Sequence, residues 1–313
     1  MLGRPLGTPL LIAAALLPAS CGQDGRSAPE QGPANAPRPA ATAPAAPQSQ
    51  PVEAPAAAAP AVRSIHVFVA LCDNKSQGIV PVSEKLGNGE DPENNLYWGA
   101  AYGVRTFFKK SADWELVASE RKAAGPVIER LVFRHRRTGA YLVADGYRGA
   151  EIRQAVANFL DACAGKRAEN LTVGAGAARA EFPAGGAARL LAYVGHNGLM
   201  DFSLAETPKG SGAGPAREAV VLACKSQLFF EKPVREAGAR PLVLTTGLMA
   251  PEAYTLAAAL EGWLAGEPPE AVAARAARAY DAYQKCGAGA ARKLFAAGEA
   301  GGGEIHGRPR AFK

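Results

Sequence analysis

The fold is decided by the stretch from residue 190 to residue 226, which opens with LLAYVGHNG (190–198) and closes with AVVLACKS (219–226). Its two apolar runs, Leu190 to Val194 and Ala219 to Ala223, are short, continuous and bounded by glycine or polar residues. Runs of this kind are typical of strands that are buried on both faces of a sheet. We therefore predict that both runs are strands in the interior of a mostly parallel sheet.

Similar runs lie on either side of this stretch. Residues Ile65 to Leu71 (IHVFVAL) and Pro241 to Thr245 (PLVLT) predict two more buried strands, and residues 127–133 and 140–143 predict a further pair. A polar loop rich in Gly, Pro and Asn, from Cys72 to Asn95, follows the first strand. Loops of that length in a folded domain are often functional.

Apolar residues at helical spacing predict helices between the strands. One pattern starts near Tyr97, with Asn94 or Asn95 available as the N-cap, and continues to Phe108. Three more helices are predicted over Ile152–Cys163, over the segment that begins at Pro251, and over Pro269 to Lys285. Strands that alternate with helices indicate an α/β fold, a three-layer αβα sandwich with a mostly parallel sheet.

The first residues have the layout of an export signal. Arg4 supplies a positive charge, and Pro9 to Leu17 forms an apolar core too short to span a bilayer. Small residues then precede Cys21, which resembles a bacterial lipobox, although Pro18 stands where leucine is usual. The alternative is an ordinary signal peptide that contains a cysteine. We predict an exported protein that faces the periplasm or the cell exterior and is held at a bacterial membrane by a lipid on Cys21.

Composition divides the chain into four parts. Residues 1–21 are the signal, and residues 22–61 are mostly Ala, Pro, Gln, Ser and Gly, a composition that cannot bury enough apolar surface to fold. Residues 62–295 carry the strand and helix patterns, and residues 296–313 form a Gly-rich tail that we expect to be flexible. We therefore predict one α/β domain at the end of a disordered linker.

The charge distribution and the motifs that the sequence lacks argue against several classes of function. The formal net charge is +6, and the basic residues are scattered apart from a cluster at Arg134, Arg136 and Arg137, so we expect no nucleic-acid partner. The sequence contains no P-loop, no dinucleotide-binding fingerprint, no GxSxG elbow and no His/Cys spacing typical of zinc. We therefore expect neither a cofactor nor a metal.

Reactive side chains follow three of the predicted strands. Cys72 and Asp73 come after the first strand, His196 follows LLAYV, and Cys224 follows AVVLA. Open α/β sheets place their ligand sites at the carboxyl ends of the strands. If the last two strands are neighbours, His196 and Cys224 lie side by side, the minimal set for a cysteine nucleophile with an imidazole acid and base. The alternatives are a histidine satisfied by local hydrogen bonds and a cysteine buried in the core or paired in a disulfide.

Two short motifs, YVGHNG (193–198) and VVLACKS (220–226), resemble in their order those of the caspase-like cysteine peptidases, the group of caspases, gingipains, clostripain and legumain. The resemblance implies a caspase-like sheet in which His196 is the catalytic histidine and Cys224 the nucleophile. It also implies an oxyanion hole made by the backbone N–H groups of Gly198 and Cys224. Asn197 departs from the pattern, because many members have glycine directly after the histidine.

Two more residues are candidates for supporting roles. In the caspase-like sheet the first strand lies beside the strand that bears the histidine, so Asp73 could orient His196 or contact substrate. The alternative for Asp73 is a turn or cap carboxylate. Arg148, just before a predicted helix, could bind an acidic group, and the alternatives are a solvated arginine or a capping contact.

The function predicted on these grounds is that of a membrane-tethered, extracytoplasmic cysteine peptidase acting on a peptide or protein substrate. Two alternatives stay open: a catalytically inactive relative that serves as a binding or scaffolding lipoprotein, and a hydrolase or transferase that uses the same dyad on a small amide or ester. Export implies an oxidising compartment, so the redox state of Cys224 matters. We expect Cys163 and Cys286, each at the end of a predicted helix, to form a disulfide.

Overall fold

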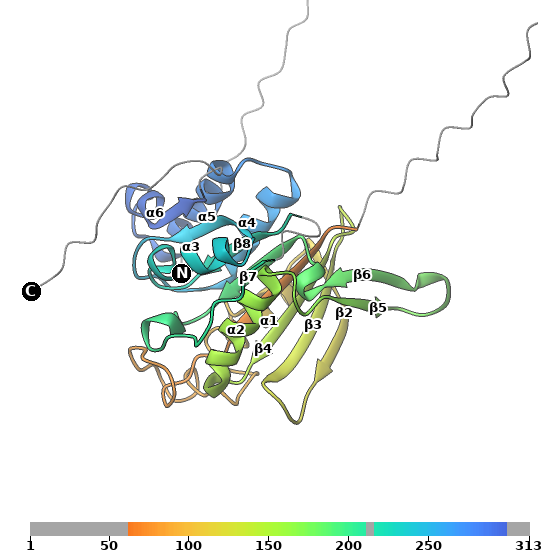
Figure 1. The fold of residues 1–313 in the computed structure, drawn as a ribbon, viewed down its shortest axis with the longest axis horizontal. Coiled ribbons are helices and arrows are strands. Elements are labelled where there is room, and N and C mark those ends of the chain that lie inside the picture. Colours follow the sequence, from red (N-terminus) through yellow and green to blue (C-terminus); the bar gives the residue numbers. More distant parts are fainter. Residues whose placement is uncertain (1–61, 211–215, 299–313) are drawn as a thin grey trace, which may run out of the picture. The chain divides into compact units, whose positions relative to one another are not determined.

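An eight-stranded sheet is the centre of residues 62–210 and 216–298, the part of the chain that the computed structural model describes (Figure 1). Its strands are β1 (Ser64–Ala70), β2 (Trp114–Arg121), β3 (Val127–His135), β4 (Tyr141–Tyr147), β7 (Leu190–Val194), β8 (Glu218–Leu222), β9 (Arg240–Thr245) and β10 (Phe295–Ala297). They lie in the order β10-β9-β8-β7-β1-β4-β3-β2. The neighbours from β4 to β9 pair in parallel, and β3, β2 and β10 pair antiparallel at the two edges.

Helices cover both faces of the sheet (Figure 1). The helices α2 (Ile152–Cys163) and α3 (Ser226–Glu236) pack on one face, and α1 (Val104–Lys110), α4 (Ala253–Leu264) and α5 (Pro269–Gln284) pack on the other. The short helix α6 (Ala288–Leu294) follows α5 and leads into β10. The predicted α/β class and its three-layer αβα arrangement are confirmed.

The two apolar layers follow from the alternation of side chains along each strand. In β1, Val67 and Val69 pack with the core on the α4 face, whereas Phe68 and Ala70 pack with the core on the α2 face. All residues of β1 and β7 are buried, which explains why both strands read as continuous apolar runs and not as alternating ones.

Several elements with few buried apolar residues were not predicted from the sequence. The strand β2 lies at the edge and is mostly exposed, and α3 carries several charged residues and Pro233 within its length. A separate two-stranded sheet, β5 (Glu169–Val173) with β6 (Ala180–Ala184), was not predicted either. Its residues Val173 and Phe182 pack against Val143 of β4 and its neighbours.

The helix predicted from Tyr97 begins later than expected, at Val104. Neither Asn94 nor Asn95 caps it. The side chain of Asn95 is used elsewhere, because its Oδ1 accepts from the N–H of Cys72 (2.9 Å) and its Nδ2 donates to the carbonyl of Cys72 (2.7 Å). This tie holds the segment before α1 against the end of β1.

The carboxyl-terminal boundary of the domain lies slightly beyond residue 295. The strand β10 extends to Ala297, and the N–H of Gly298 donates to the carbonyl of Leu242 (3.3 Å). The predicted signal (1–21), linker (22–61) and the tail from residue 299 onward lie outside the described residues. None of the helices in residues 62–210 and 216–298 is long and apolar enough to cross a membrane.

Candidate functional site

His196 and Cys224 lie at the carboxyl ends of neighbouring parallel strands. In the register of β7 and β8, Val194 pairs with Leu222, and each reactive residue follows its strand after one further residue. A hydrogen bond joins the two ends directly, because the Nδ2 of Asn197 donates to the carbonyl oxygen of Cys224 (2.6 Å). The structure therefore brings the predicted dyad to one place on the sheet edge.

The backbone before His196 needs glycine. Gly195 has a φ of 144°, a conformation that favours glycine, and a Cβ there would lie 3.0 Å from the carbonyl oxygen of Ala70 in the neighbouring β1. The carbonyl of His196 itself accepts a hydrogen bond from the buried Tyr193 hydroxyl (2.8 Å). The histidine is thus held by its own strand as well as by β8.

The imidazole of His196 is oriented by Asp201. Its Nε2 lies 2.7 Å from the Oδ2 of Asp201, and only 7 % of the residue is exposed. Because an ionised carboxylate can only accept, the neutral ring must carry its proton on Nε2. The Nδ1 is then the basic nitrogen, and it makes no hydrogen bond within the described residues.

Asp201 also fixes the long loop that follows β1. The same Oδ2 accepts a hydrogen bond from the N–H of Gly78 (2.9 Å). A Cβ at Gly78 would lie 2.4 Å from the Oδ1 of Asp201, so a larger residue there would displace this carboxylate. The carboxylate therefore links three segments: the Gly78 loop, its own turn and the histidine.

Cys224 stands on the turn between β8 and α3. Lys225, the next residue, adopts a left-handed conformation (φ 50°, ψ 35°) and is the N-cap of α3. Cys224 is half-buried and directly precedes the N-cap of that helix. Its Sγ lies 3.4 Å from the N–H and 3.5 Å from the carbonyl oxygen of Met249.

A buried hydroxyl pair braces this turn. The Ser226 Oγ donates to the carbonyl of Val221 (2.9 Å) and accepts from the N–H of Thr245 (2.8 Å). The Thr245 Oγ1 accepts from the N–H of Ser226 (3.2 Å) and donates to the carbonyl of Ala223. The backbone on both sides of Cys224 is therefore fixed to β9.

The predicted dyad and the predicted oxyanion hole are not formed in this conformation. Among the described residues, no hydrogen bond joins the Cys224 Sγ to His196, and the N–H of Gly198 donates to the carbonyl of His196 (3.1 Å). Asn197 lies at φ −80°, ψ 87°, close to an inverse γ-turn, which explains that contact. Of the two expected oxyanion donors, only the N–H of Cys224 has no acceptor within the described residues.

The side chains of Asp73 and Arg148, the two other predicted site residues, make contacts with other parts of the protein and not with His196 or Cys224. The carboxylate of Asp73 accepts from the N–H of Lys75 (3.0 Å) and from the hydroxyl of Ser76 (2.6 Å), so it holds its own turn. Arg148 donates to the carbonyls of Gly125 and Ala123 and forms an ion pair with Glu90. The carboxylate that contacts His196 is that of Asp201 and not that of Asp73.

The four cysteines of the described residues are all free, so the predicted disulfide between Cys163 and Cys286 is wrong. Cys163 is the fully buried last residue of α2, whereas Cys286 is exposed after α5. Cys72 is also fully buried, and burial raises the pKa of its thiol to about 11, against a smaller opposing effect of Tyr97. Cys224 is the free thiol that follows the strand beside the one that precedes His196.

No group of three or more His, Cys, Asp or Glu side chains within residues 62–210 and 216–298 is arranged to hold a metal ion. Comparisons of the chain with family models, with curated proteins and with solved structures find no match. What the site can do is therefore argued from its geometry.

Proposed function

We propose that the domain is a cysteine hydrolase of the caspase-like type, with Cys224 as the nucleophile and His196 as the general acid and base. The observation that supports this most is the arrangement of β7 and β8, which ends in a histidine and a free cysteine tied together through Asn197. The position of β1 beside β7 and the fixed tautomer of His196 add to it. A peptide or protein is the proposed substrate.

The proposed reaction begins when the Nδ1 of His196 takes the proton of the Cys224 thiol. The thiolate attacks the carbonyl carbon of the scissile amide, and the oxygen that becomes negative accepts from the N–H of Cys224. The imidazolium then gives its proton to the leaving amine. Water, activated by the same nitrogen, hydrolyses the thioester and restores the thiol.

Two local movements close the site in this proposal. The Cys224 Sγ turns away from the backbone of Met249 toward the imidazole, and the N–H of Gly198 leaves the carbonyl of His196 to become the second oxyanion donor. Both changes are rotations within short loops, and catalytic hydrogen bonds commonly tighten only when substrate is bound. A substrate carbonyl would replace the acceptor that Gly198 now uses.

Replacing Asp201 by asparagine is expected to lower kcat by about 10²–10⁴-fold, because the ring would lose the carboxylate that keeps its proton on Nε2. An asparagine can also donate to Nε2 and so stabilise the wrong tautomer. The measurement is the initial rate on the best peptide of a fluorogenic library, and Asp73→Asn is the matched control with an unchanged rate. Equal rates for wild type and Asp201→Asn would contradict this role.

The proposal places the domain outside the cytoplasm, held to a bacterial membrane by a lipid on Cys21. The change Cys21→Ala should then move the protein from the membrane fraction to the soluble extracytoplasmic fraction. It should also remove the mass of the acyl groups from the mature chain. If the Cys21→Ala protein stays in the membrane fraction, another anchor holds it.

A second candidate function, a non-catalytic binding lipoprotein of the same fold, is favoured by one observation. The N–H of Gly198 is occupied and the Cys224 Sγ faces Met249 and not His196. Mass spectrometry of the non-reduced native protein separates the two candidates, because a Cys224 held in a disulfide cannot act as a nucleophile.

A further inference from the structure

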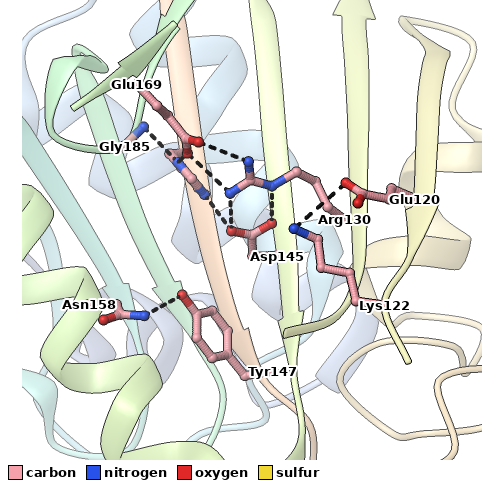
Figure 2. Close-up of polar contacts among 9 residues, drawn as sticks. Glu120, Lys122, Arg130, Asp145, Tyr147, Asn158, Glu169 and Gly185 are labelled. Atoms are coloured by element: carbon pink, nitrogen blue, oxygen red, sulfur yellow. Dashed lines mark hydrogen bonds and ion pairs between the residues drawn. The ribbon is translucent and has the colours of Figure 1, made fainter. Parts of the chain in front are cut away.

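A polar pocket lies on the α2 face of the sheet, apart from the candidate site, and its lining includes neither His196 nor Cys224. Its volume is about 290 Å³, and its walls come from β1, β3, β4, the start of β5 with the two residues before it, and Gly185 after β6. Figure 2 shows several of these residues. The polar residues in its lining that matter below are His66, Arg130, Asp145, Tyr147, Arg167 and Glu169. His66, Asp145 and Tyr147 are each 2 % exposed, so these polar residues are almost fully buried in the wall of the pocket.

Arg130 is the centre of this wall (Figure 2). Its guanidinium donates to both carboxylate oxygens of Asp145 (2.7 Å each) and to both oxygens of Glu169 (3.1 Å each). Four charge-assisted bonds leave Arg130 little capacity for a ligand. The pair of carboxylates is thereby held in a fixed position.

A backbone hydrogen bond sets the donor and acceptor roles of the two ring nitrogens of His66. Its Nδ1 accepts a hydrogen bond from the N–H of Gly185 (2.8 Å), so the proton must be on Nε2, which lies 3.0 Å from the Oδ2 of Asp145. Gly185 is required there, since a Cβ would lie 1.9 Å from the carbonyl oxygen of Arg167. Gly185 and Arg167 both line the pocket.

Two donors of the pocket have no acceptor among the described residues. The Tyr147 hydroxyl accepts from Asn158 Nδ2 (3.0 Å) but donates to no described atom, and the exposed Arg167 guanidinium forms no ion pair there. Burial and Asp145 raise the pKa of Tyr147, so the hydroxyl keeps its proton at neutral pH. Arg167 also has a left-handed φ of 55°, and such conformations are concentrated at functional sites.

The groups that a ligand in the pocket can still contact include hydrogen-bond donors and a negatively charged acceptor. Arg167 and Tyr147 offer donors to an anion, whereas the partly exposed carboxylate of Glu169 can accept from a cation. The formal charges of the wall, from two arginines and two carboxylates, cancel. A dianion would be repelled by Asp145 and Glu169, but a molecule with one charge of each sign leaves the balance unchanged.

We propose that this pocket binds a small zwitterion, a free α-amino acid, with its carboxylate at Arg167 and Tyr147 and its ammonium group at Glu169. The volume suits a molecule of that size and excludes a folded partner. The site is independent of the Cys224 chemistry, so either proposal can fail while the other holds.

The test is calorimetry and thermal unfolding of the full mature chain with each standard L-amino acid in turn. At least one is expected to bind saturably and to raise Tm as its concentration increases. Its amide, which lacks the carboxylate, and its N-acetyl derivative, which lacks the ammonium group, should each bind at least about tenfold more weakly, the loss of about one charge-assisted contact.

Two variants locate the ligand. Arg167→Asn keeps a residue that tolerates the left-handed conformation, and Tyr147→Phe removes only the hydroxyl; both should weaken binding by about tenfold or more. Arg179→Gln changes an exposed arginine that pairs with Glu181 on the β5–β6 hairpin, and it is the control with unchanged affinity. Absence of saturable binding by every amino acid, or equal affinity for the N-acetyl derivative or for both variants, would overturn the proposal.

Discussion

Replacing Cys224 by alanine, or His196 by alanine, is expected to lower the rate of peptide hydrolysis by at least about a thousandfold. The two losses should be similar and should not add in the double variant, because each change removes the same step, attack by an activated thiolate. The reason lies in the geometry: the two residues follow neighbouring strands and are tied through Asn197. The measurement is initial rates on a fluorogenic peptide library, with Tm measured beside it.

The matched control is Cys286→Ser, which removes the exposed thiol that follows α5 and should leave the rate unchanged. Neither Cys224→Ala nor His196→Ala should unfold the domain, since both side chains lie at loop positions beyond the strands. Unimpaired hydrolysis by a folded Cys224→Ala protein would remove Cys224 as the nucleophile.

Replacing Arg130 by methionine is expected to destabilise the domain by about 3–5 kcal/mol, the usual cost of leaving a buried charge without its partner. Asp145 would remain almost fully buried with only His66 beside it. Adding Asp145→Asn should recover part of the loss, because the uncompensated charge is then gone. Urea unfolding of the single and double variants measures both values.

This stability should depend on pH in a defined direction. Burial alone would raise the pKa of Asp145, but hydrogen bonds from Arg130 and His66 outweigh it and hold that pKa well below its usual value. A lowered folded pKa stabilises the protein above about pH 4, and the contribution is lost as pH falls toward the folded value. The difference between wild type and Arg130→Met should therefore shrink in acid.

The control for this series is Arg136→Met, whose ion pair with Glu115 is exposed and should contribute no more than about 0.5 kcal/mol. A loss for Arg130→Met no larger than that of the control would show that the buried network is not a major source of stability.

The interior strands were predicted well from the sequence because a strand that is buried on both faces of the sheet appears as a continuous apolar run. Each residue of β1 and β7 is buried, and both strands were expected where they are found. Edge and surface elements have no such pattern, which is why β2, α3 and the β5–β6 sheet were missed. The helix from Tyr97 was placed too early because apolar residues recur at helical spacing in a segment whose backbone is tied to Cys72 by Asn95.

The meeting of His196 and Cys224 at one edge could be predicted because parallel strands carry their loops to the same end. The side chains that hold and orient these two residues could not be predicted in this way. Asn197 seemed only a departure from a pattern, yet its amide bridges to Cys224, and Asp201 reaches the histidine through a turn that no periodicity specifies. The expected disulfide failed for a similar reason, since helix ends alone do not place two sulfurs together.

The measurement that tests the dyad most directly is covalent trapping of the full mature chain with a peptidyl ketone electrophile, followed by peptide mapping of the adduct. The account predicts one adduct, on Cys224, which is lost in His196→Ala and unchanged in Cys286→Ser. Cys72 should stay unmodified, because it is fully buried and its thiol pKa is raised to about 11. Modification of another residue, or equal labelling of Cys224 without His196, would contradict the account.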